Sequence, residues 1–285
     1  MNRFSSYLLV LVSLLIGVSE AFAQMPRERS TKSVVAEELF WAPSIVLLPS
    51  VTQLDTGNLD FTIQHAFGPV SGGIESLYGL DNSANIRFGF DYGVRDWLSV
   101  GVGRSKYDKV YDARLKARLM SGDLAHVSLF LDGAAETVKD GRSFEHRLSY
   151  FSGILLARKL SEKVSLQLMP AYSHFNLVEK NELFNGDIEE EQNDHVVIGV
   201  ALRFEANDRA SFLIEYLPVI GDRSDKTTDV LSVSVDLEAG GHVFQVFVTS
   251  TQWITPQHAV SRSRDDFFDG DFGFGFNVHR VFGTR

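Results

Sequence analysis

Apolar and polar residues alternate along most of the chain, most clearly in residues 271–282, DFGFGFNVHRVF. Phenylalanine or valine occupies positions 272, 274, 276 and 278, and glycine, asparagine and histidine lie at positions 273, 275, 277 and 279. A period of two residues predicts a β-strand with one apolar and one polar face. Helical periodicity is scarce elsewhere in the chain. The pattern therefore predicts an all-β protein.

Twelve segments of this kind follow one another after residue 57. Most are about 9–11 residues long, the length of a tilted strand that crosses a membrane. The segments are 58–67, 84–93, 97–105, 110–120, 125–137, 145–159, 164–175, 195–204, 210–217, 230–238, 242–250 and 271–282.

The connections between these segments are sorted by length. Joins from an odd to an even segment include the long ones, such as 68–83 and 176–194, whereas all joins from an even to an odd segment are tight, such as 94–96. Outer-membrane barrels sort their loops in this way, with the short turns and both termini in the periplasm. A soluble barrel or sandwich also alternates but has no reason to sort its loops. We therefore predict a transmembrane antiparallel up-and-down β-barrel of about 12 strands.

The last segment predicts how the barrel closes. An open strand edge in hydrocarbon leaves backbone groups without partners, so 271–282 should pair antiparallel with 58–67. The phenylalanines of this segment would face lipid. An aromatic residue near the end of the final strand also resembles the signal by which the barrel-assembly machinery of Gram-negative bacteria selects proteins for insertion. The residues predicted to carry this signal are Phe272, Phe274, Phe276 and Phe282.

Facing the apolar residues toward lipid places the charged residues inside the barrel. A charge on the lipid face costs about 2–4 kcal/mol at the midplane. Basic residues gather on the second, fourth and sixth segments, and acidic residues dominate the ninth and tenth. These groups form either an ion-pair network that fills the lumen or the two walls of a narrow pore. The predicted lumen residues are Asp60, Arg87, Asp91, Arg114, Lys116, Arg118, Arg147, Arg203, Glu215, Asp236 and Glu238.

The first 57 residues do not fit the strand pattern. Residues 1–23 contain a positive start, an apolar stretch and an Ala-Phe-Ala site, which are typical of a secretory signal peptide. Residues 24–57 include an apolar stretch in which Pro43 and Pro49 disfavour a central strand. This segment could form a plug in the lumen, lie at the periplasmic mouth or add a strand. The barrel itself is predicted to occupy residues 58–285.

The composition argues against several classes of function. The net charge of −10 disfavours nucleic-acid binding, and the absence of cysteine excludes a disulfide framework. The histidines lack metal-binding spacing. Ser173 and His174 are adjacent and so lie on opposite faces of a strand, which prevents a catalytic pairing. We expect no enzyme activity, cofactor or metal; calcium binding by the acidic loops 186–194 and 264–271 is the alternative.

The stretch from residue 58 to about residue 118 resembles a known family. The matching segments are NLDFTIQHAFG, YGLDNSANIRFGFDYGV, LSVGVGRS and YDARLK, with Ala66 where the family usually has arginine. The family comprises outer-membrane β-barrels of unknown function (domain of unknown function 5777), found mainly in Bacteroidetes-type bacteria. The resemblance implies a barrel fold and an outer-membrane location, and it implies no activity.

These observations predict a monomeric outer-membrane barrel that passes or binds small polar solutes. One alternative is a closed barrel that binds a partner through its outer loops. Another is a membrane enzyme that acts on lipids. The expected surroundings are outer-membrane lipid and lipopolysaccharide, whose phosphates Arg104 could contact.

Overall fold

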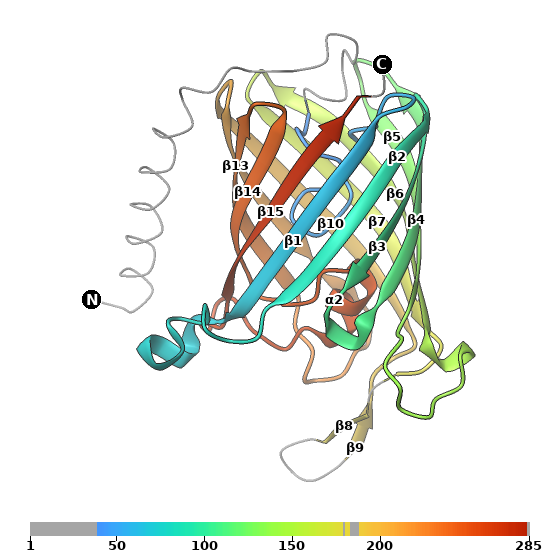
Figure 1. Ribbon diagram of the computed structural model, residues 1–285, viewed down its shortest axis with the longest axis vertical. Helices are drawn as coiled ribbons and strands as arrows, with labels where there is room; N and C mark the ends of the chain where they lie inside the picture. The colour runs from blue at the N-terminus through green and yellow to red at the C-terminus, as the bar shows by residue number, and fades with distance from the viewer. Residues whose placement is uncertain (1–38, 179, 183–187, 284–285) are drawn as a thin grey trace.

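A closed antiparallel barrel forms the body of the molecule in the computed structural model, which describes residues 39–178, 180–182 and 188–283 (Figure 1). The signal peptide predicted for residues 1–23 lies outside the described residues. Within the described ranges, no helix is long and apolar enough to cross a membrane.

All twelve predicted strands are present, and their bounds differ from the predicted ones by at most three residues. A short strand pair lies in the loop after β7, and β12 extends the pairing along β10. The strands are β1 (Leu59–Pro69), β2 (Asn85–Arg95), β3 (Leu98–Ser105), β4 (Tyr111–Ser121), β5 (His126–Ala135), β6 (Leu148–Ser161), β7 (Val164–Phe175), β8 (Lys180–Glu182), β9 (Ile188–Glu190), β10 (Asp194–Asn207), β11 (Ala210–Leu217), β12 (Val219–Ile220), β13 (Val230–Ala239), β14 (His242–Thr249) and β15 (Gly273–Phe282). The helices are η1 (Val70–Ser76), η2 (Tyr107–Lys109), η3 (Glu145–Arg147) and α2 (Pro256–Arg262).

The barrel closes between its first and last strands. β1 pairs antiparallel with β15, in a register that joins Leu59 to Phe282 and Ala66 to Gly275. The predicted closure is therefore confirmed. It leaves no free strand edge in the ring, so the backbone groups of both strands have partners on each side.

Side-chain parity follows the prediction along β1. Asp60, Thr62 and Gln64 are buried inside, and the residues between them lie on the outer surface. Glycines on β3 make room for the long inward side chains of β2. A Cβ on Gly103 would lie 2.0 Å from the Arg87 guanidinium, so the arginine could not lie across the wall if this residue were larger.

The two ends of the barrel differ as the loop lengths predict. η1, η2, η3 and the β8–β9 hairpin lie at one end, which we name the long-loop end (Figure 1). The tight turns and the C-terminal end of β15 lie at the other, the short-turn end. Tyr92, Trp97 and Phe282 are exposed on the outer surface near the short-turn end, as expected of an aromatic girdle.

Two sequence-based expectations are wrong in detail. The alternation predicts that Phe272 faces lipid with the other phenylalanines, but it precedes β15 and is buried in a cluster with Val70 and Val248. The alternation also predicts that Arg147 lies on a strand, but it lies in η3 and forms an ion pair with Asp140 in the preceding loop. In both cases the alternation continues past the end of the strand into a folded loop.

A designed disulfide would test the closure. Ile63 and Val278 are direct partners on β1 and β15, and the chain has no cysteine of its own. Cysteines at both positions should crosslink on oxidation, because paired residues place their Cβ atoms about 4.5–5.5 Å apart. The crosslink would be detected by electrophoretic mobility before and after heating. A pair at Ile63 and Phe274, which is displaced by four residues, is the control; equal crosslinking of that pair would contradict the register.

Candidate functional site

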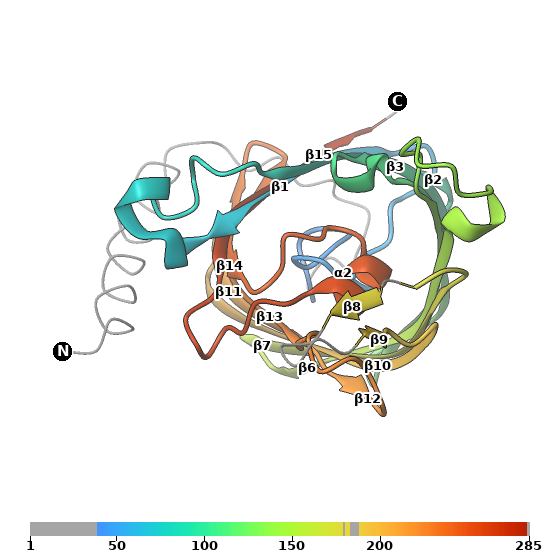
Figure 2. The ribbon, with the colours of Figure 1, turned by 90° about the horizontal axis from the view of Figure 1, so that it is seen from below.

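Residues 39–54, which we name the plug, form a compact loop inside the barrel (Figure 1 and Figure 2). The plug turns back on itself at Ile45, whose amide donates to the Leu48 carbonyl at 2.8 Å. Ser44 and Pro49 form an isolated antiparallel bridge across this turn. Of the three arrangements that the sequence left open for this stretch, the structure has the one inside the lumen.

A lysine on the β4 side of the lumen binds the carbonyl groups of the plug. The ammonium group of Lys116 donates to the carbonyls of Ser50 at 3.0 Å, Pro43 at 3.3 Å and Thr52. The side chain is buried, so these carbonyls replace the water that would otherwise solvate the charge.

A carboxylate on β11 binds the amide groups of the plug. Glu215 is fully buried and accepts hydrogen bonds from the amides of Val46 at 3.2 Å, Leu47 at 3.0 Å and Leu48 at 3.0 Å. Hydrogen bonds to a charged group are about twice as strong as neutral ones. Lys116 therefore binds carbonyl groups toward the ends of the plug, and Glu215 binds amide groups in its middle.

Wall amides complete the polar contacts of the plug. Gln167 on β7 accepts from the Val51 amide at 2.9 Å and donates to the Pro49 carbonyl at 2.8 Å. Asn277 on β15 donates to the Val46 carbonyl at 2.9 Å. The irregular backbone of the plug is thus satisfied by side chains of the wall, as buried polar groups require.

Part of the lumen wall carries apolar side chains, which the sequence did not predict. Apolar side chains of β5, β6, β7, β10 and β11 point inward and form one core with the apolar residues of the plug. Gly199 on β10 leaves space there, since a Cβ at this position would lie 2.5 Å from Cδ1 of Leu48. The wall contribution to this core includes Phe130, Phe151, Leu155, Met169, Val197, Ala201, Leu213 and Leu217.

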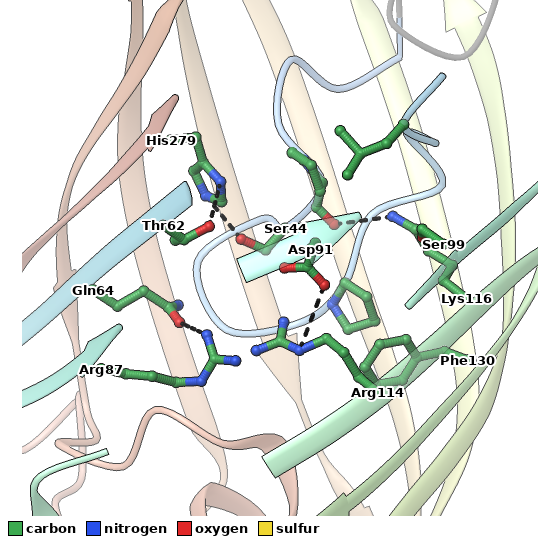
Figure 3. Close-up of a pocket in the computed structure, with 13 residues that line it drawn as sticks. Ser44, Thr62, Gln64, Arg87, Asp91, Ser99, Arg114, Lys116, Phe130 and His279 are labelled. Atoms are coloured by element: carbon green, nitrogen blue, oxygen red, sulfur yellow. Dashed lines mark hydrogen bonds and ion pairs between the residues drawn. The ribbon is translucent and has the colours of Figure 1, made fainter. Parts of the chain in front are cut away.

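The wall formed by β2 and β4 carries an ion-pair network. Arg87 binds Asp112 through two hydrogen bonds of 2.8 and 2.6 Å, and Arg114 lies 3.2 Å from Asp112. Arg114 also lies 3.8 Å from Asp91 (Figure 3). Arg87 and Arg114 thus have carboxylate partners on β2 and β4, on their own side of the lumen. The predicted network across the lumen, between these basic residues and the acidic residues of β11 and β13, is not formed among the described residues, and the plug lies between the two sides.

The loop between β14 and β15 folds into the lumen at the long-loop end (Figure 2). We name residues 250–263 the lid; every residue of its helix α2 is buried, and α2 packs against β6, β7 and β10. Gln257 donates to Asp132 on β5 at 3.0 Å. Arg262 lies 5.2 Å from the ring centroids of both Phe175 and Trp253, a cation–π geometry.

Glu136, just beyond β5, anchors the lid. Its carboxylate binds Arg262 of the lid and Arg142 of the next loop, both at 2.5 Å, and lies 3.5 Å from His258. Burial alone raises the pKa of this carboxyl, but His258, Arg262 and Arg142 outweigh burial and lower the pKa to about 2. The lid anchor therefore remains charged at any physiological pH.

A cavity beside the plug measures about 20 Å³ and is lined by Ser44, Asp91, Ser99 and Lys116 among others (Figure 3). One water molecule needs roughly 10–15 Å³. This cavity therefore has room for about one water molecule and for no larger solute.

Most of the predicted lumen residues do lie inside the barrel. Arg118 lies near the short-turn end and bonds the Asp96 carbonyl in the β2–β3 turn. Sequence reasoning missed Asp132, Glu136 and Gln167, although Asp132 has the same parity as inward Ser128. The predicted residues that are buried are Asp60, Arg87, Lys116, Arg203, Glu215, Asp236 and Glu238, and those that are half-buried are Asp91, Arg114 and Arg118.

No metal site is evident in the described ranges, where no three His, Cys, Asp or Glu side chains are grouped suitably. Part of the acidic loop 186–194 lies outside these ranges. Ser173 is buried, whereas His174 on the outer surface binds Asp194 at 2.6 Å and Asn176 at 3.1 Å.

A solved porin structure has a similar fold. The NanC porin matches at a TM-score of 0.50 and 8% identity, over 80% of this chain and 100% of that chain. The COG4313 outer membrane channel from Pseudomonas putida F1 matches at 0.49 and 12% identity, over 80% and 97% of the two chains. The KdgM porin matches at 0.41 and 10% identity, over 79% and 99%. No curated protein matches the sequence.

The closed ring of twelve strands and the porin-like fold define the chain as a membrane-bound β-barrel. Residues 40–282 match a family model described as a membrane bound beta barrel domain (DUF5777), and the chain belongs to this family. The family predicted from the sequence is therefore confirmed, whereas the expected bacterial group stays a prediction.

Loss of the Glu215 charge should loosen the plug. In a Val46→Cys background, Glu215→Gln should raise the rate of maleimide labelling at position 46 by about ten- to a hundredfold. The reason is that each hydrogen bond to a charged group contributes about 1.5–3 kcal/mol, and 1.4 kcal/mol is tenfold. Asp132→Asn, which removes a lumen charge that contacts the lid instead, is the control. Equal labelling in all three proteins would show that Glu215 does not hold the plug.

Acid should release the lid only at low pH. Because the pKa of Glu136 is lowered to about 2 in the folded protein, its contribution is complete above the ordinary value of 4.5 and is lost as the pH falls toward 2. Fluorescence of Trp253, with Trp41 and Trp97 replaced by Phe, should stay constant from pH 7 to 5 and shift to the red below pH 4.5. Glu136→Gln should show the shifted spectrum at pH 7. A transition between pH 7 and 6 would instead assign the control of the lid to a histidine.

Proposed function

We propose that this protein is an outer-membrane pore for small polar solutes, held closed by its own plug and lid. In this proposal the short-turn end faces the periplasm and the long-loop end faces the outside. The porin-like fold supports the choice of membrane, and the sorted loops support the orientation.

The observation that carries the proposal is how the lumen is filled. The plug is not part of the sheet, and wall side chains rather than strand pairing hold it. It can therefore leave without breaking the backbone ladder that keeps the barrel closed. Removal of the plug would expose a wall with Arg114 and Lys116 on one side and Glu215 on the other.

A second candidate function uses the loops alone. Ile74, Phe144 and Phe268 are between 67% and 78% exposed at the long-loop end, where apolar side chains could contact a partner. In this proposal the barrel is a closed scaffold and never conducts. Neither the pore proposal nor the scaffold proposal includes a catalytic role. Hydrolysis of phospholipid by the purified protein would contradict both in this respect.

Planar-bilayer recording separates the pore from the scaffold. The full chain should conduct rarely, and Glu215→Gln should increase the open time about tenfold or more as the plug loosens. A separate double variant, Arg114→Gln with Lys116→Gln, retains Glu215. When open, it should be more selective for cations than the unaltered protein, because Glu215, Asp236 and Glu238 are then unbalanced. Heat-dependent electrophoretic mobility would verify that each variant is folded. If no folded variant conducts, the pore proposal is wrong and the closed scaffold is the better proposal.

A further inference from the structure

The wall of the lumen binds the plug mainly through the main chain of the plug. Hydrogen bonds from wall side chains end on its carbonyl and amide groups, and Ser44 supplies a side-chain contact, to His279 at 3.0 Å. Groups that any peptide carries thus supply most of the polar contacts. The bonded carbonyls are those of Pro43, Ser44, Val46, Pro49, Ser50 and Thr52, and the bonded amides are those of Val46, Leu47, Leu48 and Val51.

The side chains of the plug meet an apolar surface. Ile45, Leu47, Leu48 and Val51 belong to the core that the inward residues of β5 to β11 form. The space beside Gly199 accommodates a leucine side chain. A ligand that fits this wall therefore carries secondary amides along one line and branched apolar groups beside it.

The two charged anchors match the two kinds of group in a peptide backbone. Glu215 accepts from amide groups in the middle of the plug. Lys116 donates to the carbonyls of Pro43, Ser50 and Thr52, toward both ends of the plug. A plain hydrocarbon chain would leave both ions buried without partners, which is unfavourable.

We propose that the lumen is a binding site for apolar oligopeptides and that residues 43–52 occupy it as an internal substitute. This inference rests on the proposed pore and names its class of solute. A free peptide that binds the wall displaces the plug, because both require Lys116, Glu215 and Gln167.

Plug displacement in the full chain tests the proposal. The reporter is maleimide labelling of the Val46→Cys protein in proteoliposomes, since Val46 is buried and the chain has no other cysteine. The probes are the octapeptide SIVLLPSV and a second apolar octapeptide of unrelated sequence. At ten times its Kd each peptide should raise the labelling rate about tenfold, because ligand binding multiplies the displaced population by about one plus the ratio of concentration to Kd. Labelling of Phe144→Cys on an exposed loop should not change.

Three further probes decide which chemistry the lumen recognises. The same octapeptide N-methylated at the residues equivalent to Val46, Leu47 and Leu48 lacks the hydrogens that Glu215 accepts, and it should have no effect. A glycine–serine octapeptide and decanoate should also have none. Release of the plug by decanoate or by the methylated peptide, to the same extent as by the apolar peptides, would show that the lumen responds to apolar bulk, and the proposal would be wrong.

Failure of this inference can be told apart from failure of the pore. If Glu215→Gln conducts in planar bilayers but no peptide raises the labelling of the Val46→Cys protein, the pore stands and the peptide site is overturned. If peptides raise the labelling while no variant conducts, the lumen is a peptide receptor without passage. Absence of both effects in folded protein would overturn both.

Discussion

A backbone amide or carbonyl in hydrocarbon has no water to bond, and this constraint determines the architecture described above. It requires strands that pair on both sides, which the contact of β1 with β15 completes. Contact with lipid separately favours apolar outward side chains, and this produces the alternation seen along the chain. Charged side chains in the middle of the strands therefore lie inside the barrel.

The same constraint applies to the plug, which has irregular backbone at membrane depth. Such backbone is tolerated only where protein or water supplies partners. Here Lys116, Glu215, Gln167 and Asn277 supply them from four different strands. The charges of the lumen were predicted either to pair with one another or to face water in a pore. Lys116 and Glu215 do neither of these; they bind carbonyl and amide groups of the plug that lies between them.

The strands and their closure could be predicted because each depends on local alternation and on the sorting of loop lengths. The starts of β6 and β15 could not, since the alternation near Arg147 and Phe272 continues into folded loops. The apolar part of the lumen wall could not be predicted, because the inner face was assigned from charged residues alone. Inward residues such as Phe151 and Leu155 are uncharged. The position of the plug rests on contacts such as that of Val51 with Gln167, 116 residues apart in sequence, which no local pattern encodes. The inward position of Asp132, by contrast, follows from the alternation along β5, because Asp132 has the same parity as Ser128.

The points at which the two internal segments join the wall determine how each can move. The plug continues into β1 at the short-turn end, where Thr56 binds Asp96 and the Gly57 amide bonds the Gly93 carbonyl. The lid is a loop between β14 and β15 and joins the wall at the opposite end. Each segment is therefore tethered at one end of the barrel, the plug at the short-turn end and the lid at the long-loop end. Plug and lid also meet in one apolar core, to which Ala259 and Val260 of the lid belong, so a displacement of either segment would uncover apolar side chains of the other.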